Sequence, residues 1–284
     1  MGELVIVLGP TGVGKSDYAV DLALSSGCPI VNCDSRQIYK ELKIGVARPS
    51  DEQLSLVKHY LVATHSVERL YSAGDYEREA VPLIESLLKT HEKVVMVGGS
   101  GMYIDAVCRG LDDFPDPDLS VRDELIRRLK EEGVESLSRQ LKEVDPEACA
   151  FIDFNNHQRI IRALEVFLST GKKYSSYRTN VRRERSFSIR KIGIRRDREV
   201  LYDRINRRVD IMMEEGLLDE VRSVEKYRSL AALNTVGYRE FFESFDGLHS
   251  LDTAVELVKR NSRHYAKKQM TYWRRDEEIE WIDF

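Results

Sequence analysis

The sequence has few of the residues that build disulfide-linked, zinc-bound or membrane-embedded proteins. Only four of its 284 residues are cysteine, and no two form a CxxC pair. We therefore expect reduced thiols in a cytoplasmic protein. No apolar run approaches the roughly 20 residues that a membrane-spanning helix needs, so we expect no membrane partner. With 42% hydrophobic and 32% charged residues, the composition is typical of a globular chain with one large domain or one domain and an insertion.

Positive charge is concentrated in two parts of a chain whose net charge is −4. Residues 157–208 hold 16 lysines and arginines against five acids, a balance of +11, and the remainder carries −15. Residues 259–275 hold seven cations and no acid. A solvated helix face usually mixes both signs at i, i+4 spacing. The one-sided runs therefore favour a site for a polyanion, nucleic acid above all.

A glycine-rich loop, GPTGVGKS, separates a first apolar run from a helical pattern. In this context backbone N–H groups turn toward an anion, while the lysine reaches a terminal phosphate and the hydroxyl ligates Mg²⁺. A chance glycine-rich turn is the alternative, and the flanking strand and helix argue against it. We predict a di- or triphosphate site with Ser16 as the metal ligand, formed by Gly9, Pro10, Thr11, Gly12, Val13, Gly14, Lys15 and Ser16.

Apolar strands alternate with helices over the first hundred residues. Near-continuous apolar strands in such an alternation predict an α/β fold with a P-loop NTPase-like parallel sheet, helices on both faces, and ligands at the carboxyl ends of the strands. The strands are expected at residues 4–8, 29–33, 59–63 and 93–97, and the helices at 17–25, around 51–57, and at 73–90.

A proline-acid segment at residues 114–118 ends this alternation. Four helices follow without a strand, at residues 119–132, 134–143, 145–151 and 156–170, and residues 187–194 then alternate like a strand that rejoins the sheet. We predict a P-loop core domain from residues 1–113 and 187–284, with C-terminal helices, and a helical insertion at 114–186. A long helix at 251–273 precedes what reads as an acidic tail.

Two further strands end in polar or glycine-rich segments. Asp34 follows the second strand, where a carboxylate can accept a proton, hold Mg²⁺ through water, or simply cap the next helix; its spacing does not separate these roles. The fourth strand ends in Gly98-Gly99-Ser100-Gly101, where ATP-hydrolysing P-loop proteins usually carry an aspartate. The glycines predict a close approach of the backbone to a ligand, and the missing acid weighs against an ATPase or GTPase.

Six motifs follow one another over nearly the whole chain: GPTGVGKS, DSRQIY, GGSGMYI, HQRIIRALE, VGYRE and YAKKQMT. Together they resemble the motifs of the bacterial tRNA dimethylallyltransferases, also called tRNA isopentenyltransferases. The chain departs from that family at Ser100, where threonine is usual, and its insertion is short.

The resemblance implies transfer of a dimethylallyl group from dimethylallyl diphosphate to N6 of adenosine 37 of tRNA, with release of pyrophosphate and Mg²⁺ as cofactor. Asp34 would be the general base, and Ser100 would lie near the bridging oxygen of the leaving group. Arg208, with Arg204 as the alternative, would reach the pyrophosphate. The target base would be flipped out of the anticodon stem-loop. We expect a monomer.

The same resemblance assigns the tRNA contacts. Gln158 and Arg159 suit base edges and Arg162 suits phosphates, whereas Tyr238 can either stack on a base or pack in the core. The full set is Asp34, Ser35, Arg36, Gln37, Ser100, Arg122, Gln158, Arg159, Ile160, Ile161, Arg162, Asn234, Thr235, Val236, Gly237, Tyr238 and Arg239.

Three other functions compete with tRNA prenylation. A P-loop kinase of a small metabolite needs ATP turnover and leaves both basic runs unexplained. An RNA-binding module switched by a nucleotide would carry out no chemistry. An adenylate isopentenyltransferase would act on free AMP or ADP. The basic runs favour tRNA as the acceptor.

Overall fold

The computed structural model describes residues 2–116, 118–179 and 182–284, which form two compact units. Unit 1 combines the chain up to Arg109 with Glu184–Phe284, and unit 2 is Gly110–Arg183. The sequence predicts the insertion at 114–186. Pro117, in the expected proline-acid break, lies outside the described residues.

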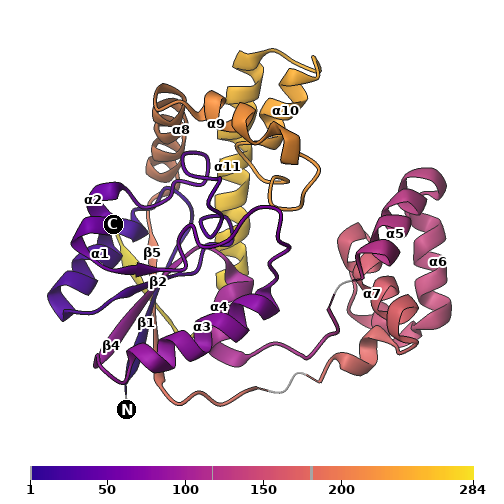
Figure 1. Ribbon diagram of the computed structural model, residues 1–284, viewed down its shortest axis with the longest axis horizontal. Helices are drawn as coiled ribbons and strands as arrows, with labels where there is room; N and C mark the ends of the chain where they lie inside the picture. Colours follow the sequence, from indigo (N-terminus) through magenta and orange to yellow (C-terminus); the bar gives the residue numbers. More distant parts are fainter. Residues whose placement is uncertain (1, 117, 180–181) are drawn as a thin grey trace. The chain divides into compact units, whose positions relative to one another are not determined.

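Unit 1 is built on a parallel sheet that has six strands within the described residues, in the order β3-β2-β4-β1-β5-β6 (Figure 1). In the centre β1 pairs with β4 and β5, so that Leu8 lies opposite Gly98 and Gly193. The five strands expected from the sequence are confirmed, with ends shifted by a few residues. The strands are β1 (Glu3–Leu8), β2 (Ile30–Asn32), β3 (His59–Tyr60), β4 (Lys93–Gly98), β5 (Ser188–Arg195) and β6 (Ile279–Asp283).

Helices cover both faces of the sheet, as the apolar strands predict. Successive side chains of a strand point to opposite faces. Ile6 of β1 therefore joins one core cluster with α3 and α4, whereas Val7 joins another with α1. These helices are α1 (Lys15–Ser26), α3 (Ala73–Leu87) and α4 (Gly101–Arg109). The predicted α/β class is confirmed.

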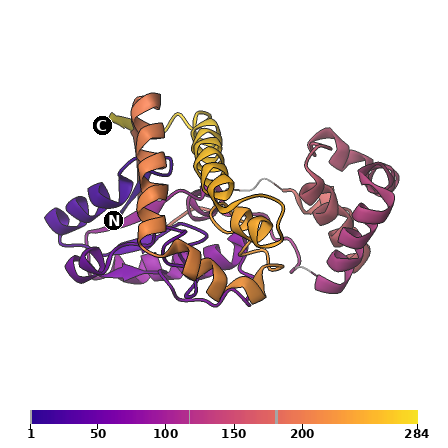
Figure 2. The same ribbon diagram turned by 90° about the horizontal axis from the view of Figure 1, so that it is seen from above.

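The remaining α-helices of unit 1 lie between β5 and β6 in the sequence, apart from α2 (Asp51–Leu56). Helix α8 lies beside α11, as both views show (Figures 1 and 2). The later helices are α8 (Arg198–Glu214), α9 (Leu217–Ser223), α10 (Arg239–Phe245) and α11 (Leu251–Trp273).

The segment expected to be an acidic tail is instead the edge strand β6. It pairs in parallel with β5, with Gly193 opposite Trp281. Its acids bind the basic side chains of β5: Arg190 contacts Glu280 at 2.6 Å and Arg195 contacts Asp283 at 2.7 Å. Part of the basic run at 157–208 is thus neutralised by residues about 90 positions away.

Unit 2 has its own apolar core and three α-helices within the described residues. The helices are α5 (Leu119–Glu132), α6 (Val134–Val144) and α7 (His157–Thr170). Leu125, Leu141 and Leu164 are fully buried at their meeting point. The helix expected at 145–151 is a short 3-10 helix, Pro146–Ala150, and a second one spans Tyr174–Tyr177.

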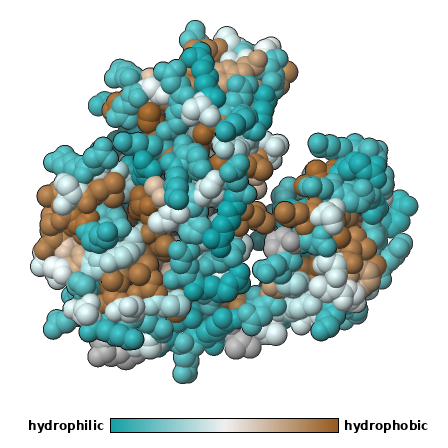
Figure 3. Space-filling view, in the orientation of Figure 1, coloured by the Kyte–Doolittle hydropathy of each residue, from teal (hydrophilic) through white to brown (hydrophobic). Residues whose placement is uncertain are grey.

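Neither unit offers a segment suited to crossing a membrane, because every helix in the described ranges is too short or too polar for it. The face seen in Figure 3 is mainly hydrophilic, with smaller hydrophobic patches.

Lys191 of β5 forms ion pairs with two acids just before β6, and these pairs give a stability prediction. Lys191 is 4% exposed, and it contacts Asp276 at 2.8 Å and Glu278 at 2.7 Å. Burial opposes its charge, but the hydrogen bonds to both acids outweigh burial and raise the pKa of Lys191. Lys191→Met leaves the largely buried carboxylate of Asp276 with only the more distant Arg109, at 3.7 Å, and should lower the free energy of unfolding in urea by about 3 kcal/mol.

The neighbouring pair supplies the control. Arg190 and Glu280 are half exposed, so Arg190→Met should cost less than about 1 kcal/mol. Equal losses in the two variants would show that burial does not govern the strength of these pairs.

Candidate active site

The carboxyl ends of β1, β2 and β4 meet at one edge of the sheet. The backbone N–H of Cys33 donates to the carbonyl of Val97 at 2.8 Å, which holds β2 and β4 together where both end. The backbone N–H of Ser35 then donates to the Ser100 hydroxyl at 2.8 Å. The structure therefore brings Asp34 and Ser100 together at the carboxyl ends of two neighbouring parallel strands.

The glycine loop opens α1 in the expected way. Gly12 and Gly14 have φ of 81° and 103°, which only glycine adopts without strain, and the helix begins at Lys15. The backbone N–H of Thr11 donates to Oε1 of Gln269 on α11 at 2.9 Å. The C-terminal helix thus holds the loop in place.

Two arginines fasten the loop from its other side. Nε of Arg196 donates to the carbonyl of Val13 at 2.8 Å, and Nε of Arg204 donates to that of Gly12 at 2.9 Å. Arg204 is therefore tied to the backbone of the loop. Arg208, one turn further along α8, lines both cavities beside Lys15.

Two adjoining cavities lie over the loop and share Lys15, Ala47, Arg208 and Met212. The first has a volume of about 300 Å³ and the second about 840 Å³. The first is lined by Thr11, Lys15, Asp34, Ser35, Arg36, Gly45, Val46, Ala47, Ile205, Arg208, Val209, Met212, Asn234, Thr235, Val236, Gly237, Arg239, Val258, Ser262, Tyr265 and Gln269. The second includes Gly12, Gly14, Ser16, Lys43, Arg48, Arg204 and Arg207.

Burial disfavours the charged forms of the two cations in this site, Lys15 and Arg208. Burial lowers the pKa of Lys15 from 10.5 to about 8; Asp34 opposes that shift and Arg208 adds to it. Burial also lowers the pKa of Arg208, again against the influence of Asp34. Two cations face one carboxylate, so a bound anion would restore the balance of charge.

Asp34 caps the turn after β2, one of the roles that the sequence leaves open, and it also lines a cavity. Its Oδ1 accepts the backbone N–H of Arg36 at 2.9 Å and that of Gln37 at 3.4 Å, which caps the turn after β2. The same side chain lines the first cavity. Capping therefore fixes one carboxylate oxygen and leaves the group placed for chemistry.

The glycines at the end of β4 allow close packing within the protein. A Cβ on Gly98 would lie 2.4 Å from the carbonyl carbon of Cys33, and one on Gly99 would lie 2.3 Å from Nε2 of Gln269. The close approach expected toward a ligand is thus an approach to β2 and α11. The sequence analysis also misses α4, which begins at Gly101.

Glu220 on α9 holds the loop at 43–45, a role that no sequence motif indicates. Its carboxylate accepts the backbone N–H groups of Lys43 at 3.0 Å, Ile44 at 2.7 Å and Gly45 at 3.0 Å. It also accepts the hydroxyl of Tyr238 at 2.6 Å. Gly45 lines the first cavity, so this one carboxylate shapes its wall.

Tyr238 itself is fully buried, and its ring carbons would lie 2.7 to 2.8 Å from a Cβ on Gly45. It packs in the core, which excludes stacking of its ring on an RNA base. Its neighbours Asn234 and Arg239 are exposed.

Two cavity residues that the sequence analysis leaves unassigned lie on α11. Tyr265 and Gln269 are four residues apart and therefore share one face of the helix. Both fall inside the YAKKQMT motif, and their i, i+4 spacing on a long helix is a signal that could have indicated them.

The tRNA contacts predicted in unit 2 divide into surface and core. Gln158 and Arg159 are exposed on α7. Ile160 and Ile161 are fully buried in the core of unit 2, so their side chains are not part of a surface that RNA can reach. Contact of the exposed residues with tRNA stays a prediction.

A family model described as IPP transferase matches residues 37–276 of the chain. Relatives named tRNA dimethylallyltransferase are similar over nearly the full length. The protein from Bacteroides thetaiotaomicron is 52% identical and covers 99% of this chain and 92% of its own. The one from Parabacteroides distasonis is also 52% identical, over 99% and 94%.

Solved structures of tRNA-modifying transferases are also similar to this chain. The full-length tRNA isopentenylpyrophosphate transferase of Bacillus halodurans superimposes with a TM-score of 0.73 at 35% identity, over 100% of this chain and 90% of its own. A eukaryotic dimethylallyltransferase acting on tRNA reaches a TM-score of 0.83 at 23% identity, over 100% and 74%, which shows the fold.

The lowered pKa of Lys15 predicts how anion binding depends on pH. Below about 8 the ammonium is charged and attracts an anion, and above that pH it loses its proton. Pyrophosphate affinity, measured calorimetrically without metal, should fall as the pH rises through 8. Lys15→Arg should remove this fall, because arginine stays charged. A fall of the same size in both proteins would assign it to another group.

Loss of the Glu220 carboxylate should loosen the loop at 43–45. Glu220→Gln replaces one acceptor by a donor that faces backbone N–H groups. We expect pyrophosphate to bind roughly tenfold more weakly, about 1.4 kcal/mol. Asp219→Asn, on the same helix but paired with Arg222, is the matched control and should leave binding unchanged. Unaltered binding in Glu220→Gln would contradict the role of the loop.

Proposed function

The chain belongs to the tRNA dimethylallyltransferase family and is a tRNA prenyltransferase, and from this premise we propose dimethylallyl diphosphate as its donor and N6 of adenosine 37 in the anticodon loop as its acceptor. One observation carries the proposal: Lys15 of the glycine loop, the carboxylate of Asp34 and an apolar wall share a single cavity. Membership of this family disfavours the kinase, the nucleotide-switched module and the enzyme that acts on free AMP or ADP.

The donor fits the charge and shape of the first cavity and the loop beside it. Its diphosphate would lie against the backbone N–H groups of the loop, with Lys15 and Arg208 supplying the positive charge. The apolar side chains of Val209, Met212 and Val258 line the same cavity and suit a branched five-carbon group. This arrangement binds the leaving group by charge and the transferred group by apolar contact.

Mg²⁺ fits the donor set as a companion of the substrate. Among the described residues no three His, Cys, Asp or Glu side chains form a metal cluster. The Ser16 hydroxyl and Asp34 line one small cavity, and Mg²⁺ commonly takes one or two protein oxygens together with substrate phosphates. Bound there, it would neutralise charge on the departing pyrophosphate.

The reaction forms a C–N bond to adenine and breaks the C–O bond to the diphosphate. An exocyclic amine is a weak nucleophile, and Asp34 is placed to take its proton as the new bond forms. The Ser100 hydroxyl already accepts the N–H of Ser35, and its own proton can point to an oxygen of the leaving group. Asp34 would thus act on the attacking amine and Ser100 on the leaving diphosphate.

The tRNA would contact both units. In unit 1, Arg36, Asn234 and Arg239 line the cavity, and the half-exposed ring of Tyr265 offers a stacking surface for the extruded base. In unit 2, the exposed side chains of Gln158 and Arg159 would offer polar groups to the anticodon loop of the tRNA. Four free cysteines suit the cytoplasm, and we propose that the protein acts there as a monomer.

Asp34→Asn tests the assignment of the base. Transfer of labelled dimethylallyl diphosphate to unmodified tRNA should fall by about 10² to 10⁴, because the amide cannot take the proton. Pyrophosphate affinity should persist and serves as the control for an intact cradle. Undiminished transfer would show that Asp34 is not the base. The same assay with AMP in place of tRNA identifies the acceptor.

A further inference from the structure

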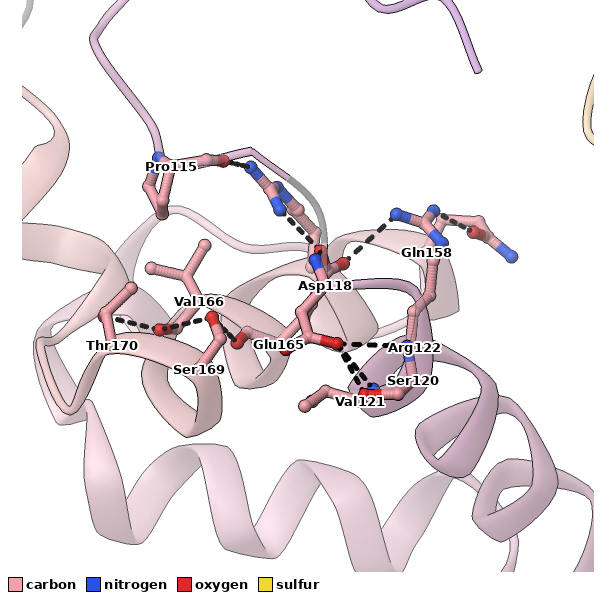
Figure 4. Close-up of polar contacts among 11 residues, drawn as sticks. Pro115, Asp118, Ser120, Val121, Arg122, Gln158, Glu165, Val166, Ser169 and Thr170 are labelled. Carbon is pink, nitrogen blue, oxygen red and sulfur yellow. Dashed lines mark hydrogen bonds and ion pairs between the residues drawn. The ribbon is translucent and has the colours of Figure 1, made fainter. Parts of the chain in front are cut away.

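A fully buried carboxylate lies at the centre of a polar cluster in unit 2 (Figure 4). Glu165 projects from α7, and both of its oxygens are engaged. Oε1 accepts from Nη1 of Arg162 at 2.7 Å and from the backbone N–H of Asp118 at 3.1 Å. Oε2 accepts from Nη1 of Arg122, on α5, at 3.1 Å. One acid therefore links α7 to α5 through Arg122, and it also holds Arg162 of its own helix.

Each of these arginines also has a second acceptor. Nη2 of Arg162 donates to the carbonyl of Pro115 at 2.6 Å, and Nη2 of Arg122 donates to Oε1 of Gln158 at 3.4 Å. Both guanidinium groups are thus held at two points. Even so, the side chain of Arg122 is 28% exposed and that of Arg162 is 23% exposed. A guanidinium has five N–H donors, so each keeps donors for an external acceptor.

Two guanidinium groups face the single carboxylate of Glu165, and the nearby carboxylate of Asp118 is engaged in capping α5 through Ser120 and Val121. A flexible arginine loses side-chain freedom when it binds an anion, and a guanidinium that is already fixed avoids that loss. Arginine forks match phosphate in a bidentate geometry. The cluster therefore has the charge, the donors and the rigidity of a preorganised phosphate site.

Arg127, on α5, shows the contrasting arrangement. Arg127 pairs with Glu124 and Glu131, and all three side chains are about half exposed. Such pairs exchange readily with water and are nearly neutral in energy. Burial of the acid is what distinguishes the Glu165 cluster.

We propose that Glu165 is a positioning residue for tRNA binding, which holds Arg122 and Arg162 in the orientation that receives RNA phosphates. This rests on the proposed function, in which unit 2 binds tRNA. Glu165 does not touch the RNA in this arrangement. It acts through the two arginines.

Neutralising the acid separates positioning from simple charge. Glu165→Gln makes unit 2 more positive by one charge, so a purely electrostatic effect would tighten RNA binding. A positioning role predicts the opposite. With the full chain and unmodified tRNA, we expect the Kd and the KM for tRNA to rise about tenfold, with kcat at saturating tRNA and pyrophosphate affinity unchanged.

A matched control removes an exposed acid from the same unit. Glu131→Gln should leave the Kd for tRNA unchanged or slightly lower. Arg162→Lys keeps the charge but loses the fork, and should reproduce the rise in Kd. It also keeps the test decisive if Glu165→Gln fails to fold.

Wild-type or tighter tRNA binding in folded Glu165→Gln overturns the proposal. This includes the case in which Glu165→Gln has a lower unfolding temperature but an unchanged Kd for tRNA. If Glu165→Gln does not fold, an unchanged Kd in Arg162→Lys overturns it. Failure of the unaltered protein to bind or prenylate tRNA would instead refute the proposed function.

Discussion

The active site depends on positive charge held beside one carboxylate at the edge of a parallel sheet. Lys15 and Arg208 are both forced into a cavity where burial lowers their pKa, and Asp34 offsets only part of that effect. An anion relieves this imbalance. The packing of the unit serves the same arrangement: Gly99 admits Gln269, which in turn holds the N–H of Thr11. The close packing of α11 against β4 therefore also holds the glycine loop in place beside Lys15 and Arg208.

Carboxylates that accept several hydrogen bonds act as anchors in both units. Glu220, which is partly exposed, holds three consecutive backbone N–H groups of a cavity loop, and the fully buried Glu165 holds two arginines in unit 2. For Glu165 these donors satisfy an acid that would be costly to bury alone. The acids thereby turn flexible loops and long side chains into fixed parts of a surface. This rigidity is what a prenyl transfer needs, because both substrates must be aligned before the bond forms.

Local patterns predicted much of unit 1 and the centre of the site. The apolar strands, the glycine loop and Asp34 are each visible within a few residues of sequence, and the structure places them together. The edge strand β6 was missed because its acids read as a solvated tail, although Ile279 and Trp281 alternate like strand residues. The basic run looked unbalanced for the same reason: its partners, such as Glu280 for Arg190, lie about 90 residues away.

By itself the sequence determined the parallel sheet, the phosphate loop and the resemblance to a family, because short-range periodicity and ordered motifs carry that information. Only the tertiary structure decided which charges remain available, which residues of a motif face outward, and which acid holds which loop. Ile160 and Ile161 stand in a motif beside exposed Arg159, yet they pack in a core. Burial and pairing depend on contacts between distant segments, and no local pattern in one sequence records those contacts.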